Sequence, residues 1–513
     1  MLRSHALMVV GVSSVLAVAG PPASAEEADV QQLKQELAAL QRKLNVLEKQ
    51  VEVNHTQEQA AIRSYETLTS GKDKDSSDPW GKLYGVKFTF GGFVAAEGVF
   101  RNKDEVTSIG SAFQKIPFDN SQLAHINELR GTAQQSRISL LAEGNINDHE
   151  KWSGYVEFDF LGAAPTANSV ESNSYTPRIR QFYGTYDNTA DGWHFLAGQS
   201  WSLVTMFKSG LIARQENVPW TIDAQYVPGF NWLRNPEVRI VKDWDKKVWL
   251  GIEASSPQAI FGGSSITPTI VSTGCNSQLD PQANCTLDFM PDFTAKLAVD
   301  PGWGHFEIFG LARGFRDRIT NATPHSDQTY GFSGGGGMIL PIFGDKLQFQ
   351  ANVLYGQGIG RYDAAQLADA TLNPDGSVAP LTGFSIMGGI TSHNAIKDLD
   401  LYAYAGENHV FNHFSDSSGY GNPALLNNSG CDILNGTCTG STQLQDVWQV
   451  TGGFWLRLYD GDKGIVTWGL QNSYTVDTTA EDSKGVRGKA DMDVTMMSFR
   501  YYPKYGTLIG TKP

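Results

Sequence analysis

The chain has 513 residues and a formal net charge of −14, with 40 Lys and Arg against 54 Asp and Glu. It has no basic tail or lysine-rich block, which argues against nucleic acid as a partner. The mean hydropathy of −0.28 is typical of soluble proteins, but transmembrane β-barrels share it because only alternate strand residues face lipid. Glycine is abundant at 54 residues and aromatic residues reach 11%, which suits a barrel that bends at glycine and carries aromatic girdles.

The first 25 residues predict a secretory signal peptide. Arg3 and His5 form a short basic head, residues 6–20 are apolar, and Ala23-Ser24-Ala25 is a cleavage pattern. The alternative is a retained membrane anchor. No later stretch approaches the roughly 18 consecutive apolar residues of a transmembrane helix. We therefore expect an exported protein whose mature chain begins at Glu26.

Residues 26–69 predict a periplasmic coiled coil. Apolar residues recur there at alternating steps of three and four, which is the seam of a coiled coil and implies oligomerisation. The alternative is a single amphipathic helix folded against its own domain. Residues 70–83 are polar and charged and predict a flexible linker. The seam consists of Val30, Leu33, Leu37, Leu40, Leu44, Leu47 and Val51.

Residues 84–503 predict sixteen antiparallel strands, an even number as closed bacterial barrels require. Residues 504–513 remain as a C-terminal tail. The predicted strands are 84–100, 136–147, 151–162, 177–188, 192–204, 236–244, 247–256, 290–300, 303–316, 327–341, 345–359, 381–393, 398–411, 444–459, 463–478 and 489–503.

The connections between these strands alternate between short and long along the whole segment. Outer-membrane barrels have this rhythm because their periplasmic turns are tight and their outer loops are long. The strands also alternate in polarity: Ser153, Tyr155, Glu157 and Asp159 share one face, and the apolar residues between them take the other. In a barrel of this size the apolar face meets lipid and the polar face lines water. The fold class is therefore all-β, a 16-stranded antiparallel transmembrane β-barrel preceded by a short N-terminal α-helical coiled coil.

Four cysteines form two close pairs, Cys275 with Cys285 and Cys431 with Cys438, each in a long connection. In an exported protein this spacing indicates two local disulfides that would staple surface loops. A metal site would need histidines or a C-x-x-C spacing near them, and neither is present. We expect no metal and no cofactor.

Charged residues within strands must face the lumen, because Arg or Lys facing the lipid midplane costs about 2–4 kcal/mol. A guanidinium matches a carboxylate, so a lumen with several arginines would favour small anions. The alternative is that these arginines pair with lumen acids and only brace the wall. In general porins the third long connection folds into the pore, and this analogy predicts the same path for residues 205–235. The alternative is a loop that lies at the rim. The candidate pore-lining residues are Arg137, Arg178, Arg180, Arg214, Arg234, Arg239, Arg313, Arg457 and Arg500.

Four segments of the predicted barrel are distinctive: Gly154-Tyr155-Val156-Glu157-Phe158-Asp159-Phe160, Gly198-Gln199-Ser200-Trp201-Ser202, Arg234-Asn235-Pro236-Glu237-Val238-Arg239 and Ser498-Phe499-Arg500-Tyr501-Tyr502-Pro503. Together with the order of coiled coil, linker and sixteen-stranded barrel, they resemble the DcaP-like porin family, and the resemblance spans nearly the whole mature chain. It implies a homotrimeric channel for small anionic solutes, dicarboxylates in particular. Residues 504–513 depart from the family by continuing beyond an aromatic terminus that normally helps barrel insertion.

The leading hypothesis is an outer-membrane porin for passive diffusion of small anions. Its expected partners are outer-membrane lipid and lipopolysaccharide, further copies in a homotrimer, and peptidoglycan through the coiled coil. The rivals are a porin for phosphate, sugars or cations, a structural protein that tethers the cell wall, and an adhesin or phage receptor. The sequence has no G-x-S-x-G or H-E-x-x-H motif, so we expect no enzyme.

Overall fold

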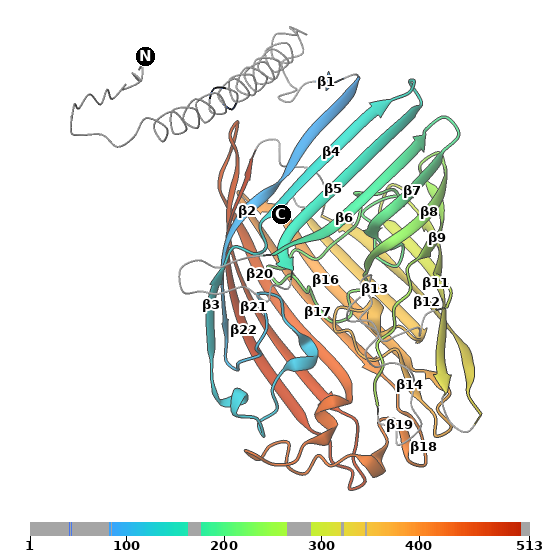
Figure 1. Ribbon diagram of the computed structural model, residues 1–513. Coiled ribbons are helices and arrows are strands. Elements are labelled where there is room, and N and C mark those ends of the chain that lie inside the picture. The colour runs from blue at the N-terminus through green and yellow to red at the C-terminus, as the bar shows by residue number, and fades with distance from the viewer. Residues whose placement is uncertain are drawn as a thin grey trace, which may run out of the picture. The chain divides into compact units, whose positions relative to one another are not determined.

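The computed structural model describes residues 41, 43, 82–83, 85–162, 176–263, 289–319, 323–343 and 346–503. The predicted signal peptide, coiled-coil seam, C-terminal tail and Cys275–Cys285 pair lie outside the described residues, apart from Gln41 and Lys43, which are helical and exposed. The linker lies outside them up to residue 81. Its last residues, Lys82 and Leu83, form the short strand β1 (Lys82–Leu83). Contacts divide the chain at residues 81 and 82 into two units, and the second is the β-sheet domain of Figure 1.

Sixteen long strands form this domain, and each predicted strand corresponds to one of them. The ends differ from prediction by only a few residues, because the alternation of polar and apolar side chains marks each strand directly. The strands are β2 (Val86–Arg101), β4 (Arg137–Asn145), β5 (Glu150–Gly162), β6 (Thr176–Asn188), β7 (Trp193–Trp201), β8 (Arg234–Trp244), β9 (Val248–Ser255), β10 (Asp292–Val299), β11 (His305–Ile319), β12 (His325–Ile342), β13 (Leu347–Gln357), β16 (Thr382–Ile396), β17 (Leu399–Val410), β20 (Leu444–Gly461), β21 (Gly464–Thr479) and β22 (Lys489–Pro503).

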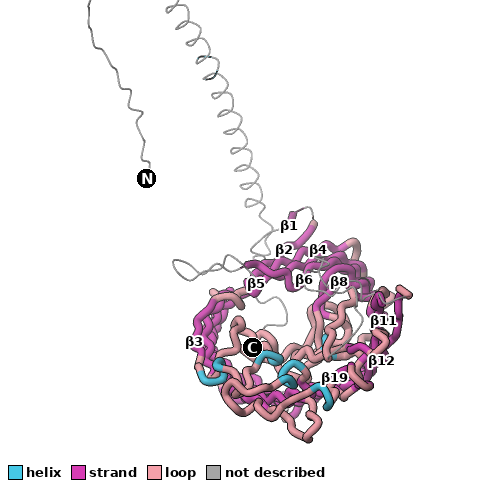
Figure 2. The backbone as a smooth tube through the Cα atoms, turned by 60° about the horizontal axis from the view of Figure 1, so that its bottom comes forward, coloured by secondary structure: helices cyan, strands magenta, loops and turns pink. Residues whose placement is uncertain are grey.

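The sheet closes on itself. Each strand pairs antiparallel with its neighbours in the chain, and β2 pairs both with β4, where Phe93 faces Arg137, and with β22, where Ala95 faces Arg500. The short strand β3 (Glu128–Thr132) extends the β4 side of β2. Closure leaves no open sheet edge, which is what hydrocarbon requires of a β structure. Figure 2 looks along the resulting ring.

The polarity of the barrel is inverted relative to a soluble protein. In β10, Asp292, Thr294 and Lys296 are buried, whereas Phe293 and Leu297 are exposed. The same alternation recurs around the ring, with buried carboxylates, guanidiniums and hydroxyls inside and exposed Ile, Val, Leu and aromatic residues outside. This is the pattern of a barrel that faces lipid outward and water inward. Among the described residues, no helix is long and apolar enough to cross a membrane.

Outward-facing aromatic residues gather at the end of the barrel that carries the short turns. Trp152 contacts Tyr186 with ring centroids 5.2 Å apart, and Tyr186 contacts Phe195 at 6.0 Å. Trp193, Trp244 and Trp303 are exposed at the same turns. Amphipathic rings prefer the interface between water and hydrocarbon, so these residues form an aromatic girdle of the predicted kind.

The long connections carry short additional elements that the strand pattern did not predict. They include the hairpins β14 (Ala370–Leu372) with β15 (Val378–Pro380), and β18 (His413–Ser415) with β19 (Ser418–Tyr420). They also include five single-turn 3-10 helices: η1 (Phe113–Lys115), η2 (Gln122–His125), η3 (Gly360–Tyr362), η4 (Pro423–Leu425) and η5 (Thr439–Thr442). The Cys431–Cys438 disulfide lies between β17 and β20, as predicted, and closes a loop of the long-connection end.

The connection between β7 and β8, residues 202–233, lies inside the barrel, and we call it the inner loop. Its backbone N–H groups donate to inward side chains of distant strands: Leu203 to Glu253 at 2.6 Å, and Ile222 to Gln471 at 2.6 Å. Because these acceptors stand on β9 and β21, the loop crosses the interior, where Figure 2 shows loop segments within the ring. The porin analogy predicted this inward path.

Candidate functional site

Six of the nine candidate arginines form ion pairs with carboxylates of the inner wall. Each arginine pairs with a buried acid on the same or a neighbouring strand, and Arg313 also pairs with Asp369 of the connection between β13 and β16. A buried carboxylate without a partner would be costly, so these arginines stabilise the wall. The pairs are Arg178 with Asp159, Arg180 with Glu157 and Asp159, Arg239 with Glu237 and Glu253, Arg313 with Asp292 and Asp369, Arg457 with Asp400, and Arg500 with Glu97.

The other three candidates, Arg137, Arg214 and Arg234, form no ion pair with a carboxylate in the part of the chain that the structure describes. Arg137 Nε, Arg214 Nη1, and both Nε and Nη1 of Arg234 are enclosed and have no hydrogen-bond partner there. Enclosed donors of this kind favour an acceptor that arrives from solution, and an anion is the best acceptor for a guanidinium.

Aromatic rings hold two of these guanidinium groups in place. Arg137 begins β4, and its guanidinium carbon lies 5.3 Å from the centroid of Phe93 on the neighbouring β2. Arg234 begins β8, and its guanidinium carbon lies 5.0 Å from Trp201 and 5.3 Å from Trp232. Cation–π contact orients a guanidinium without neutralising its charge. The positive charge of both residues therefore remains available to a ligand.

The inner loop and the wall formed by β4 to β7, β20 and β22 enclose a narrow cavity of about 90 Å³. Arg137, Arg214 and Arg500 line it, together with Glu157 from the wall and Glu216 from the loop. Glu157 is held by Arg180 through a 2.6 Å ion pair, so its charge is compensated from behind. We call this cavity the constriction.

The two acids that the inner loop contributes to the constriction are buried. Burial raises the pKa of both Glu216 and Asp223, so each ionises less readily than an exposed acid. Asp223 also contacts the connection between β2 and β3, because its Oδ2 accepts a 2.6 Å hydrogen bond from the Ser111 hydroxyl. These acids therefore offset the charge of the arginines less than exposed carboxylates would.

Two wider cavities adjoin the constriction. One of about 760 Å³ lies at the short-turn end and shares Arg214 with the constriction. The other, of about 440 Å³, lies among the long connections, shares Ala224 with the constriction, and is lined by Arg178 and Arg234. Each wider cavity shares one lining residue with the constriction, so the three cavities adjoin one another inside the barrel.

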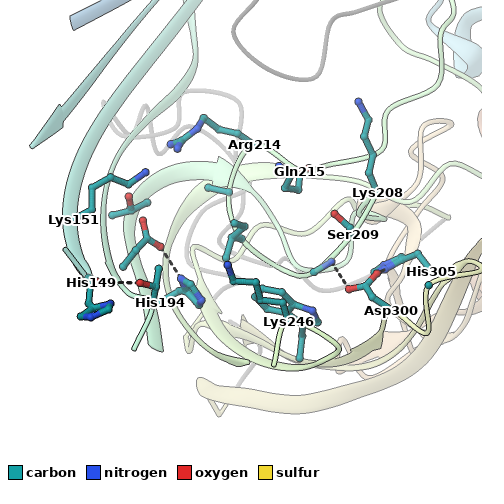
Figure 3. A pocket seen from close by; sticks show the side chains of 18 of the residues that line it. His149, Lys151, His194, Lys208, Ser209, Arg214, Gln215, Lys246, Asp300 and His305 are labelled. Atoms are coloured by element: carbon teal, nitrogen blue, oxygen red, sulfur yellow. Dashed lines mark hydrogen bonds and ion pairs between the residues drawn. The ribbon is translucent and has the colours of Figure 1, made fainter. Parts of the chain in front are cut away.

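Figure 3 shows the cavity at the short-turn end. Side chains of Lys151, Lys208 and Arg214 stand on different parts of its lining, with His305 beside Asp300. Lys208 and Arg214 come from the inner loop, and Lys151 comes from β5. Asp300 also accepts a 2.8 Å hydrogen bond from the Gly210 N–H group, which joins the inner loop to the short turn between β10 and β11.

Sequence reasoning missed the aromatic cluster that supports the arginines. Tyr226 contacts Phe230, Trp201 and Trp232 at centroid distances of 5.3, 6.1 and 5.4 Å. Tyr226 and Arg214 both have φ of +71°, a conformation that costs non-glycine residues about 1–3 kcal/mol and concentrates at functional sites. The available signal was the number of aromatic residues in this connection, which contains Phe207, Trp220, Tyr226, Phe230 and Trp232.

No family is matched by the sequence of the chain, and no curated protein is similar to it in sequence. The structure is similar to the crystal structure of the outer membrane channel DcaP of Acinetobacter baumannii, with a TM-score of 0.57 and 18% identity over 82% of this chain and 98% of that one. Weaker similarities, at 10% identity, are to OmpT of Vibrio cholerae (TM-score 0.43, 82% and 98% covered) and OprB of Pseudomonas putida (0.44, 81% and 94%). The resemblance to DcaP is thus confirmed at the level of the fold: the chain folds as a closed 16-stranded antiparallel barrel like that of the DcaP channel.

Proposed function

We propose that this protein is an outer-membrane channel through which small anions diffuse passively. The observation that carries the proposal is the contrast among the lumen arginines: six are neutralised by wall carboxylates, while Arg137, Arg214 and Arg234 keep unpaired donors at or beside the constriction. Passive selection needs weak binding at a narrow point, so that a solute enters and also leaves. No energy source enters this mechanism.

Dicarboxylates are the proposed solute class. A guanidinium group on a strand and another on the inner loop can each receive one carboxylate, and a guanidinium matches a carboxylate bidentately. Arg137 and Arg214 line the constriction together, and Arg234 lines the adjoining outer cavity. A dianion would therefore pass from Arg234 to Arg137 and Arg214 in succession.

The same proposal includes the remaining expectations from the sequence. The protein is exported by residues 1–25, assembles as a homotrimer, and contacts lipopolysaccharide with its outer face. Residues 26–69 form a coiled coil in the periplasm, where it can contact peptidoglycan. Residues 70–83 connect this segment to the barrel. The outward apolar surface and the aromatic girdle of the barrel support the membrane location.

The test is single-channel recording in a planar bilayer under a salt gradient, with and without succinate. We expect an anion-leaning reversal potential, conductance steps in groups of three, and fewer open events when succinate is added. A cation-leaning potential would discard the arginine assignment and keep the barrel. Folded, inserted protein without conductance would reject transport and favour the structural alternative.

A further inference from the structure

Three metal-ligating side chains gather on the outward face of the barrel, away from the lumen. Tyr402, Tyr404 and Asn408 of β17 are buried on the inward face, so Glu407 and His409 take the opposite face. Asp446 of β20 stands directly opposite His409 in the strand register. One ligand atom from each of Glu407, His409 and Asp446 lies within 4.8 Å of the other two.

The imidazole of His409 is fixed in its plane by two rings. It stacks on Phe384 with a centroid distance of 5.0 Å and an interplanar angle of 9°, and it meets the edge of Phe411 at 4.5 Å. Its Nδ1 atom contacts Asp446 Oδ1, whereas its Nε2 atom is enclosed and has no hydrogen-bond partner among the described residues. Within the described residues, the one polar contact of the ring is therefore with Asp446.

Among the described residues, His409 is the only side chain that forms an ion pair with the carboxylates of the cluster, and its partner is Asp446. No lysine or arginine forms an ion pair with Glu407 or Asp446 within the described ranges. Two adjacent carboxylates repel each other and one imidazole cannot neutralise both, so their proximity carries an electrostatic cost. A bound cation would remove this cost, and rigid placement of the three ligands by two paired strands would lower the entropy lost on binding.

We propose that Glu407, His409 and Asp446 form a binding site for a divalent transition-metal ion such as Zn²⁺. One imidazole with two carboxylates is a donor set that zinc accepts, usually with a water in the fourth position. Mg²⁺ and Ca²⁺ prefer oxygen ligands alone, so the histidine favours the transition metals. The ion would take the place of the direct contact between His409 and Asp446.

The position of the site indicates its effect. Strand β17 ends at Val410 and β20 begins at Leu444, and the disulfide-bonded connection runs between them. An ion bound by both strands would cross-link β17 and β20 at the point where this connection leaves the barrel. The site is separate from the constriction, so this inference does not depend on the proposed transport.

The test uses the purified, folded full-length protein in detergent, with Zn²⁺ titrated by calorimetry and Co²⁺ followed by its visible absorption. We expect one equivalent per chain, and at least a tenfold loss of affinity in His409→Ala and in Glu407→Gln. The matched control is His413→Ala, an exposed histidine in the same region that contacts Asn373 and should leave binding unchanged.

A second measurement distinguishes loss of the metal site from misfolding of a variant. Zn²⁺ should raise the unfolding temperature of the wild type and of His413→Ala, and it should not raise that of Glu407→Gln. Absence of binding by the wild type below millimolar Zn²⁺, or equal binding by all variants, would overturn the site. Conductance is recorded in a separate experiment. A protein that does not bind Zn²⁺ can therefore still be a channel, and a protein that does not conduct can still bind Zn²⁺.

Discussion

Against strands β8 to β13 the inner loop packs on ion-paired charges and apolar side chains, whereas against β4 to β7, β20 and β22 it leaves a cavity lined by guanidinium groups, two of which have no carboxylate partner among the described residues. On the first side, Lys296 donates 2.7 and 2.9 Å hydrogen bonds to Glu307 and to the Thr205 carbonyl of the loop. Leu203, Phe207 and other apolar residues of the loop pack there against the wall. On the second side lies the constriction. We call the packing of the inner loop against the wall the seal.

The difference shows that the presence of an arginine in the lumen does not by itself indicate its role. Arg313 and Arg137 both occupy inward-facing positions of strands. Arg313 forms ion pairs with two buried carboxylates, whereas the guanidinium of Arg137 lies against an aromatic ring. The first arrangement stabilises the wall and the second retains charge for a ligand. Removing Arg313 should therefore mainly lower the stability of the barrel, whereas removing Arg137 should mainly reduce its selectivity for anions.

The largest expected effect on stability is that of Arg313→Gln. It leaves Asp292 and Asp369 buried without a cation, which costs about 3–5 kcal/mol. We expect a marked fall in the unfolding temperature of the barrel, with the ion selectivity of the surviving channels little changed. A variant as stable as the wild type but with altered selectivity would show that Arg313 belongs to the permeation path.

A smaller effect is expected from Gly229→Ala in the inner loop. Gly229 has φ of +90°, and a Cβ at this position would overlap the Ile386 carbonyl oxygen of β16. Strain of this kind costs about 1–3 kcal/mol, and it should loosen the seal rather than unfold the barrel. We expect larger and noisier single-channel currents. Gly388→Ala, where a Cβ meets nothing within 4 Å, is the control and should conduct like the wild type.

A pH effect should also act on the seal. Burial raises the pKa of Asp363 to about 7, and its Oδ2 accepts the Gly229 N–H at 2.7 Å. Because an exposed Asp titrates near pH 4, the packed loop binds the extra proton between about pH 4 and 7. Stability of the packed loop therefore falls as pH rises through this window and levels off above it.

We accordingly expect steadier currents near pH 5 than near pH 8 in the wild type. Asp363→Asn cannot titrate and should reduce this difference. Burial also raises the pKa of Glu105, in the connection between β2 and β3, to about 7. If a pH dependence persists in Asp363→Asn, Glu105 is the next residue to substitute. Currents that become noisier toward acidic pH would contradict the assignment.

The strands could be predicted almost completely from the sequence, and the interior could not. Residues 152–160 alternate so regularly that facing, length and turn position follow from the letters alone, and β5 has the predicted polar set buried. The pairing of Arg180 with Glu157 crosses between strands, and that of Arg313 with Asp369 joins a strand to a distant connection. Such contacts depend on register and on loop paths, which one sequence does not encode locally.

The inner loop illustrates the same limit. Its inward path followed from analogy to porins, but the residues that hold it in place, Asp300, Glu307 and Gln471, stand about 90 to 250 positions along the chain from their N–H donors. The sequence predicts Arg214 as a pore-lining residue because it is a cation in this loop, and it lines the constriction. The sequence does not predict a role for Tyr226, because an aromatic residue in a connection belongs to no periodic pattern.

The central claim is that unpaired guanidinium groups set the preference of the channel for anions. The most direct measurement is the reversal potential under a salt gradient for Arg137→Gln/Arg234→Gln, compared with the wild type and with Lys463→Gln, an exposed cation in the short turn between β20 and β21. Each lost charge-assisted hydrogen bond is worth about 1.5–3 kcal/mol, so the double variant should lose anion preference and bind succinate at least tenfold more weakly. Lys463→Gln should match the wild type. Unchanged anion preference in the double variant would contradict the account.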